Sequence, residues 1–267
     1  MTAAEHLHIT ASAGVLRIHL DKPAKRNALD DDMIAAITDA VDMAGRDEAV
    51  RVILFTAEGD HFCSGFDIVG RNRGDADARP RIGSIQRRLP SQSHRLIPLL
   101  ATVQVPVVCA VRGWAAGIGL HLVAASDFAI VVDDATLWEP FTERGFTPDS
   151  GGTWLLPRLI GTVRAREMLL LGRTVSGKEA AEWGLVHQAV PASELDAAVD
   201  AVVQQLANGP TVALGLTKWM LHAGASASLE EHLRNEAFAL ELSSRSQDFR
   251  EGMAAFVEKR SPRFEGR

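Results

Sequence analysis

The sequence predicts an α/β fold, and two strand–turn–helix units are the clearest sign of it. Short apolar runs at residues 52–55 and 107–111 have the length of buried strands, and each leads into a glycine-containing turn followed by a helical segment. From Thr162 onward the apolar residues recur almost entirely at helical spacing. A chain of 267 residues with 46% hydrophobic content can bury one large core. We therefore expect a strand-containing core, followed by a helical C-terminal third that also packs on a neighbouring subunit.

The first elements of the chain are predicted from the spacing of their apolar residues. Residues 7–10 and 15–20 alternate apolar and polar side chains around an Ala-Gly pair, which indicates a hairpin with one solvated face. Asp30 or Asp31 can cap the helix that comes next, and Gly45 is expected to end it. The apolar positions of this helix fall at helical spacing: Met33, Ile34, Ile37, Val41 and Ala44.

The elements that follow are less regular. Residues 70–81 carry charges and glycines without an apolar period, which predicts a surface loop that could close over a ligand. Residues 82–103 return to helical spacing, with Pro90 and Pro98 marking a start or a kink. Further strands are expected at residues 128–132 and 185–190.

The stretch from Val105 to Asp127 is predicted to hold the binding site. A buried strand breaks at Gly113 and is followed by Gly117 and Gly119 before an apolar helix. Glycines at such a junction let the backbone approach a ligand closely, and the first amides of a helix have no intrahelical partner. The spacing G-x-x-x-G-x-G matches neither the dinucleotide motif nor the P-loop, so an enolate or another oxyanion fits better than a phosphate. The sequence therefore predicts an anion hole.

Composition and charge exclude several classes of protein. The net charge is −6, with 28 Lys and Arg against 34 Asp and Glu, which disfavours nucleic acid as a partner. The N-terminus has no signal-peptide pattern, and no window of about 18 consecutive apolar residues occurs, so we expect a cytoplasmic protein without a membrane span. Cys63 and Cys109 are expected to be buried thiols in a reducing compartment. The histidines and cysteines show no metal-ligand spacing, and neither a metal nor a separate cofactor is expected.

Five sequence blocks, taken in order, resemble the crotonase (enoyl-CoA hydratase/isomerase) superfamily over nearly the whole chain. They are KRNAL at 25–29, HFCSGFDI at 61–68, VPVVCAVRGWAAGIG at 105–119, PDSGGTWLLPRLIG at 148–161 and AAEWGLVHQAV at 180–190. The resemblance implies a crotonase-like spiral of ββα repeats over residues 1–195 and a helical trimerisation region over residues 196–267. It also implies an acyl-CoA substrate, with coenzyme A present only as part of that thioester, and a homotrimer or hexamer.

The same resemblance assigns binding residues. It implies that the backbone amides of Phe66 and Ile118 form an oxyanion hole for the thioester carbonyl. The donors are backbone groups, so the side chains can vary, but the β-branched Ile118 excludes a positive φ and we expect helical backbone there. The other residues implied to contact coenzyme A or the acyl group are Lys25, Arg26, Ala28, Ser64, Gly65, Asp67, Ile68, Gly117, Phe141 and Lys259.

The candidate catalytic residues depart from the two-glutamate pattern of the family's hydratases. The two glutamate positions correspond to His121 and Phe141, so neither carries a carboxylate. Asp149 matches instead the acidic position of the dienoyl-CoA isomerases, and its block, with the terminal EKRSPRF, resembles the epoxyphenylacetyl-CoA isomerase branch. We therefore expect an acyl-CoA isomerase in which Asp149 carries a proton through an enolate. Asp149 could also, or only, cap the helix that begins near Gly151.

Other assignments stay open. His121 could act as an acid, a base or a water ligand, or be a satisfied core histidine. His94 and Asp149 match the base and the nucleophile of 4-chlorobenzoyl-CoA dehalogenase, although the tryptophan that accompanies them there is missing. Glu139 and Glu143 could supply a second carboxylate, with surface charge as the default. A hydratase acting through a noncarboxylate residue and a noncatalytic acyl-CoA binder are the remaining alternatives.

Overall fold

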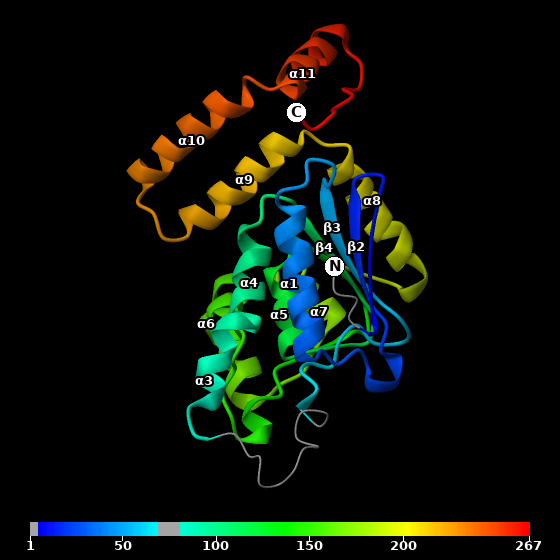
Figure 1. Ribbon diagram of the computed structural model, residues 1–267, viewed down its shortest axis with the longest axis vertical. Coiled ribbons are helices and arrows are strands. Elements are labelled where there is room, and N and C mark those ends of the chain that lie inside the picture. Colours follow the sequence, from blue (N-terminus) through cyan, green and yellow to red (C-terminus); the bar gives the residue numbers. More distant parts are fainter. Residues whose placement is uncertain (1–4, 69–80) are drawn as a thin grey trace.

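A mostly parallel β-sheet forms the centre of the molecule (Figure 1). The structure is a computed structural model, and it describes residues 5–68 and 81–267. The predicted hairpin is confirmed at one edge of the sheet, where β1 and β2 pair antiparallel, and the pairs from β2 to β9 are parallel. In spatial order the strands of this sheet are β1 (Leu7–Ser12), β2 (Val15–Leu20), β3 (Val52–Ala57), β4 (Val107–Val111), β6 (Phe128–Val132) and β9 (Gln188–Val190). A smaller sheet contains β5 (Trp114–Ala116), β7 (Thr136–Trp138) and β8 (Val175–Ser176).

Helices cover both faces of the larger sheet. Figure 1 shows α1, α4 and α5 on one face and α8 on the other, and α8 contacts β3, β4 and β6. The predicted first helix is confirmed, because the Asp30 carboxylate caps it by accepting a hydrogen bond from the Met33 amide and Gly45 ends it. The helices are α1 (Asp31–Ala44), α3 (Ser84–Arg88), α4 (Ser93–Thr102), α5 (Ile118–Ala125), α6 (Gly152–Leu171), α7 (Gly177–Trp183), α8 (Leu195–Ala207), α9 (Thr211–Gly224), α10 (Leu229–Ser243) and α11 (Gln247–Glu258).

The interruption predicted at Pro90 within residues 82–103 is confirmed. The helices α3 and α4 are separated by a 3₁₀ turn, Leu89–Ser91, because Pro90 has no amide hydrogen to continue the α-helical bonding. The strand expected at residues 185–190 is shortened to β9. The loop predicted at residues 70–81 lies almost wholly outside the described residues.

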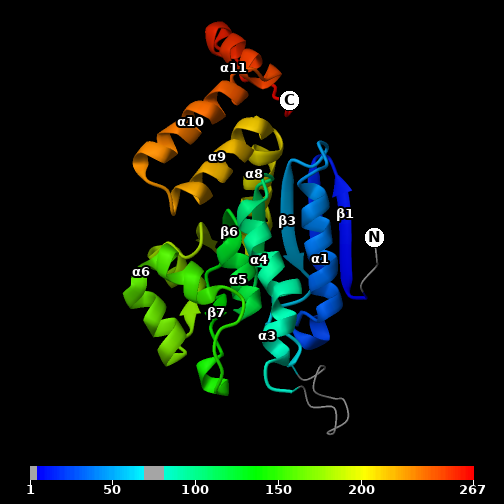
Figure 2. The ribbon, with the colours of Figure 1, turned by 60° about the vertical axis from the view of Figure 1, so that its left-hand side comes forward.

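The C-terminal helices divide into one that completes the core and three that project from it. Leu195, Val199 and Val203 of α8 are buried against the sheet, so α8 contributes to the core. Figures 1 and 2 show α9, α10 and α11 extending past one end of the sheet. Within the described ranges, none of the helices is both long enough and apolar enough to cross a membrane.

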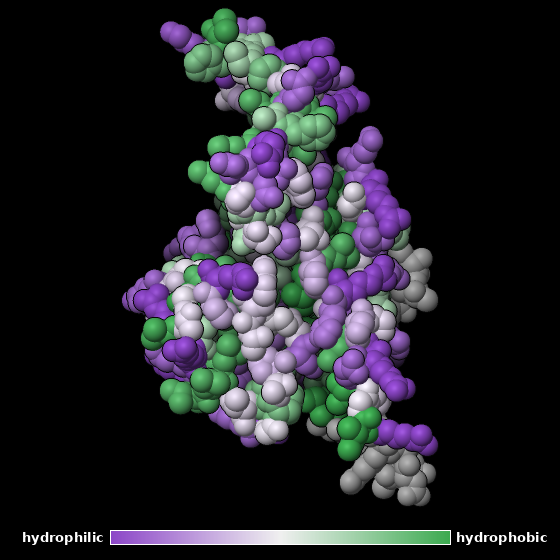
Figure 3. Space-filling model, turned by 90° about the vertical axis from the view of Figure 1, so that its left-hand side faces the viewer, coloured by the Kyte–Doolittle hydropathy of each residue, from purple (hydrophilic) through white to green (hydrophobic). Residues whose placement is uncertain are grey.

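The projecting helices expose many large apolar side chains. Figure 3 shows hydrophobic residues interspersed with hydrophilic ones over the upper part of one face of the molecule. Those on α9, α10 and α11 with the greatest exposure are Leu221, Leu229, Leu233, Phe238, Leu240, Met253, Phe256 and Val257. Such surface on an isolated subunit is typical of a protein–protein interface, which agrees with the expectation that these helices pack on a neighbouring copy.

Candidate active site

Two turns meet at the carboxyl ends of the neighbouring strands β3 and β4. Cys63 in the first turn pairs with Ala115 in the second, with the Cys63 amide donating to the Trp114 carbonyl at 2.9 Å. The first turn of α5 lies directly on this pair, since a Cβ at Gly119 would fall 2.6 Å from the Cys63 carbonyl oxygen. The segments that carry the Phe66 and Ile118 amides are therefore side by side.

The backbone at both predicted oxyanion donors is fixed. Gly117 has a φ of 54° and ψ of −124°, and Ile118 begins α5 with helical backbone, as its β-branched side chain predicts. The Ile118 amide lies in the first turn of α5, where intrahelical acceptors are missing. On the other side Leu29 donates to the Gly65 carbonyl and the Asp67 amide donates to the Leu29 carbonyl, so a short parallel bridge holds the Phe66 peptide. Two rigid backbone segments of this kind can bind an oxyanion.

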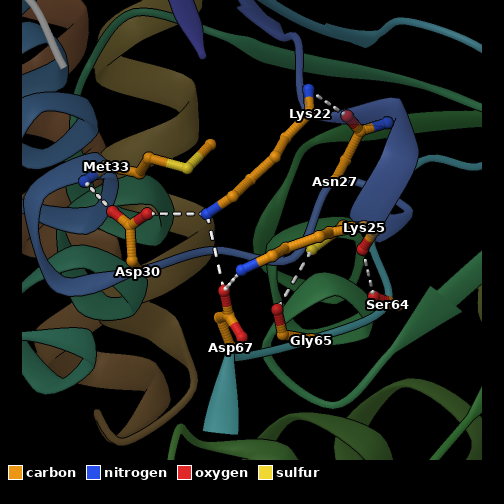
Figure 4. A network of polar contacts seen from close by, with 9 residues as sticks. Lys22, Lys25, Asn27, Asp30, Met33, Ser64, Gly65 and Asp67 are labelled. Atoms are coloured by element: carbon orange, nitrogen blue, oxygen red, sulfur yellow. Dashed lines mark hydrogen bonds and ion pairs between the residues drawn. The ribbon is translucent and has the colours of Figure 1, made fainter. Parts of the chain in front are cut away.

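A cluster of charged side chains holds the turn that contains Phe66 (Figure 4). The nearly buried Lys22 ammonium lies 2.8 Å from Asp30 and 3.6 Å from Asp67, and Lys25 lies 2.6 Å from Asp67. Burial raises the pKa of the Asp30 carboxyl, but the hydrogen bonds from Lys22 and the Met33 amide outweigh it and bring that pKa below its usual value. Lys25, predicted to meet coenzyme A, is thus paired with Asp67 in this structure.

Side chains from α5, from the end of β7 and from the start of α6 form a buried polar chain. His121 Nε2 lies 2.8 Å from Glu139 Oε1, and its Nδ1 lies 2.6 Å from Ser150 Oγ. His121 is fully buried and Glu139 almost fully, so the expectation of Glu139 as surface charge is wrong. The Phe141 ring stacks parallel to the His121 ring at 5.9 Å. A Cβ at Gly152 would fall 2.3 Å from His121 Nε2, so the hydrogen-bonded pair of His121 and Glu139 has room only because residue 152 is a glycine.

Asp149 does not cap the helix that follows it. Gly151 is the N-cap residue of α6 and no side chain makes a capping hydrogen bond there, so the capping prediction is wrong. The Asp149 carboxylate lies instead beside Ser150, with 3.2 Å between Oδ1 and the hydroxyl. Its backbone carbonyl accepts a hydrogen bond from Nε2 of the exposed His94 at 2.8 Å. Asp149 itself is partly exposed, at the outer end of the buried chain.

The structure brings most of the predicted site residues to this edge of the sheet, but not all. Arg26 is exposed next to Lys25, Ala28 is buried under the same turn, and Ser64 Oγ donates to the Lys25 carbonyl. Ile68 is the last described residue before the gap and is partly buried. Lys259 follows α11, which lies at the end of the molecule away from α3 (Figure 1), so it does not join Lys25 within one chain.

Both cysteines of the chain are buried in the core. Cys63 and Cys109 are both buried and free, and burial raises the pKa of each thiol to about 12, which confirms them as packing residues. Across residues 5–68 and 81–267, no three His, Cys, Asp or Glu side chains are grouped as metal ligands would be.

Ser150 and Lys22 are site residues that the sequence interpretation missed, and Glu139 was considered as a second carboxylate without its burial against His121. Ser150 stands inside a block that was singled out, yet nothing in its spacing indicated that it joins Asp149 to His121. A buried glutamate has no sequence signal of its own. The glycine pair at the start of α6, Gly151 and Gly152, is a signal that a side chain from another element packs closely against this backbone.

Comparison with known proteins confirms the family and the fold. The family model described as enoyl-CoA hydratase/isomerase matches residues 10–267. The chain is 36% identical over 254 residues to the 1,2-epoxyphenylacetyl-CoA isomerase of Escherichia coli, covering 95% of this chain and 96% of that one. It is 39% identical over 256 residues to a Rhodobacter capsulatus protein named "Probable enoyl-CoA hydratase", covering 96% of each. The crystal structure of an enoyl-CoA hydratase from Bacillus anthracis superposes with a TM-score of 0.90 at 28% identity, over 98% of this chain and 100% of that one. The matched family model and the crotonase fold together show that this chain belongs to the enoyl-CoA hydratase/isomerase family.

Proposed function

We propose that this protein is an acyl-CoA thioester isomerase that moves a double bond through an enolate. In the proposed reaction Asp149 removes a proton from the carbon next to the thioester carbonyl and returns it two carbons further along the acyl chain. Between these steps the negative charge rests on the thioester oxygen, where the Phe66 and Ile118 amides donate to it. Each fixed donor of this kind is typically worth about 3 kcal/mol, and a positioned base about 10²- to 10⁴-fold in rate.

One observation carries the choice of Asp149. Three carboxylates follow β7 before α6 begins, and they differ in surroundings: Glu139 is buried against His121, Glu143 is exposed, and Asp149 is partly exposed beside Ser150. A proton carrier must reach the substrate and still be held in place, and Asp149 meets both conditions. The 36% identity to a protein named an isomerase supports the same choice.

Hydration is the second candidate, because a relative at 39% identity carries a hydratase name. In this chain His121 would have to replace the missing glutamate. Both ring nitrogens of His121 are already hydrogen-bonded, one to Glu139 and one to Ser150. The His121 side chain also has no exposed surface, which argues against direct contact with water or substrate. Dehalogenation would need His94 as a base. It is disfavoured because His94 Nε2 is hydrogen-bonded to the backbone carbonyl of Asp149.

The test is turnover by the Asp149→Asn variant. Asparagine has nearly the same shape but cannot accept and return a proton, so turnover of a 3-enoyl-CoA should fall by about 10²- to 10⁴-fold. Melting temperature and the affinity for a nonreactive acyl-CoA should stay close to wild type. Asp134→Asn is the matched control, since Asp134 is exposed in the turn between β6 and β7.

A panel of thioesters separates the alternatives. Turnover of a 2-enoyl-CoA with water, without isomerisation, would replace the proposal by hydration. Chloride release from 4-chlorobenzoyl-CoA would replace it by dehalogenation. Tight binding of acyl-CoA with no turnover on the panel would make the protein a binder. An Asp149→Asn variant with near wild-type isomerisation would remove Asp149 from the mechanism.

A further inference from the structure

A hydrogen-bonded chain of four side chains leads from Asp149 into the protein interior. Asp149 Oδ1 lies 3.2 Å from Ser150 Oγ, Ser150 Oγ lies 2.6 Å from His121 Nδ1, and His121 Nε2 lies 2.8 Å from Glu139 Oε1. Three separate elements supply these residues: α5, the segment after β7, and the segment before α6. The chain begins at a partly exposed carboxylate and ends at a buried one.

When Glu139 is ionised, counting donors limits the protonation states of this chain to two. The ionised Glu139 carboxylate can only accept, so His121 Nε2 carries a proton. The Ser150 hydroxyl has a single hydrogen. If it is donated to an ionised Asp149, then Nδ1 must donate to Ser150 and His121 is an imidazolium. If Ser150 donates to Nδ1 instead, His121 is neutral and Asp149 must hold the proton that it shares with Ser150.

The surroundings of Glu139 favour the imidazolium state at rest. Glu139 Oε2 is buried and has no hydrogen-bond partner among the described residues, so the negative charge of Glu139 is offset chiefly by His121. The Phe141 ring lies face to face with His121 on one side, which suits a cation. Other charged groups on α4 have their own partners: His94 is hydrogen-bonded to the Asp149 backbone, and Arg95 pairs with Asp39.

We propose that Glu139, His121 and Ser150 form an internal proton relay that keeps Asp149 ready to act as a base, an inference that rests on the proposed role of Asp149. In one step a proton moves from Asp149 Oδ1 to Ser150 Oγ while the Ser150 proton moves to His121 Nδ1, which leaves Asp149 ionised and His121 an imidazolium. The charges of Glu139, His121 and Asp149 sum to −1 before and after the step, so no net charge is created in the buried site. These three residues act through Asp149 and are positioning residues.

The experiment compares Ser150→Ala, Glu139→Gln and the double variant. Ser150→Ala cuts the relay at its middle, and Glu139→Gln removes the charge that holds the imidazolium, which lets Ser150 turn its hydrogen away from Asp149. Each single change should lower kcat about 10- to 100-fold, less than the full general-base effect, with KM little changed. Because both act on one relay, the double variant should be no slower than the slower single variant. Ser150→Thr keeps the hydroxyl and should restore most of the rate.

Ser93→Ala is the matched control. Ser93 is also buried, and its hydroxyl has no hydrogen-bond partner within the described part of the chain, so this change should leave kcat unaltered. Nitrogen-15 spectra of histidine-labelled protein give a readout that is independent of turnover. His121, assigned by its loss in His121→Asn, should be protonated on both nitrogens in the wild type and on one nitrogen in Glu139→Gln.

The outcomes separate the relay from the proposed function. If Asp149→Asn abolishes turnover while Ser150→Ala keeps wild-type kcat, the relay is overturned and the role of Asp149 stands. If Asp149→Asn retains turnover, the proposed function fails, and the nitrogen-15 spectra still decide whether the relay exists. A His121 that is neutral in the wild type, or rate losses that multiply in the double variant, would also overturn the relay. Ser150→Ala removes only one hydroxyl group, so this variant still tests the relay if the Glu139→Gln protein does not fold.

Discussion

Replacing Gly152 by alanine should destabilise the protein, although alanine is the better helix former. Gly152 is the first residue of α6, where alanine would usually gain up to about 1 kcal/mol. Its Cβ, however, would fall 2.3 Å from His121 Nε2 and 2.8 Å from Glu139 Oε1. Neither group has room to move, since His121 is stacked on Phe141 and both partners are buried. In the charged state proposed above, separating this buried pair costs about 3–5 kcal/mol, so the net loss should be about 2–4 kcal/mol.

Thermal and denaturant unfolding of Gly152→Ala measure this loss directly. For a chain of this size the melting temperature should fall by roughly 5–10 °C. Gly252→Ala in α11 is the matched control, because its Cβ would lie 3.5 Å from the Phe264 ring, an ordinary contact, and it should be neutral or stabilising. A Gly152→Ala protein as stable as wild type would show that the His121–Glu139 pair does not occupy this space, and would refute the packing argument.

Three other properties can be predicted from the structure. Lys218→Met should lower the free energy of unfolding by about 3–5 kcal/mol, because it leaves the Asp127 carboxylate without the cation that lies 2.7 Å away; a loss under about 1 kcal/mol in denaturant unfolding would contradict this. Since burial raises the pKa of Cys63 and Cys109 to about 12, both thiols stay protonated below that pH, and a thiol reagent should label the native protein slowly, with little acceleration as the pH rises from about 7 to about 9. Fast labelling without unfolding would argue against their burial. The exposed apolar side chains of α9–α11 predict self-association, for which the family resemblance implies a trimer or a pair of trimers; light scattering would disprove it by giving the monomer mass of 28.8 kDa.

Elements with strong local signals were predictable from the sequence, and elements defined by distant contacts were not. The strands at residues 107–111 and 128–132 have the predicted bounds, because a short apolar run between turn residues is a local pattern. For α8, the apolar stripe alone does not reveal whether it faces the chain's own sheet or another subunit. The break between α3 and α4 falls at Pro90, where the sequence predicts a start or a kink, because proline is itself a local signal.

The site shows the same division between local and distant signals. The helical start at Ile118 followed from the glycine before it and from its own branched side chain. The capping role given to Asp149 was wrong because Gly151 occupies the cap position, and a cap motif cannot be told from a nearby carboxylate by spacing alone. Glu139 and Ser150 meet His121 across sequence separations of 18 and 29 residues. Only the packing of α5, β7 and α6 brings these residues together.

The two sides of the proposed oxyanion hole are held by different means, and this bears on how coenzyme A could be bound. The Ile118 side rests on the buried His121 chain, whereas the Phe66 side rests on the cluster around Asp67 (Figure 4). Of the two lysines in that cluster, Lys22 is nearly buried and Lys25 is 44% exposed. The Lys25 side of this pair is open to solvent although the Asp67 side is nearly buried, so the Lys25 ammonium can reach a phosphate in place of Asp67. Lys22, which lies 3.6 Å from Asp67 and is shared with Asp30, would still offset part of the Asp67 charge, and the backbone bridge to Leu29 would still hold the Phe66 turn. The observed Lys25–Asp67 pair is therefore compatible with the proposed role of Lys25 in binding coenzyme A.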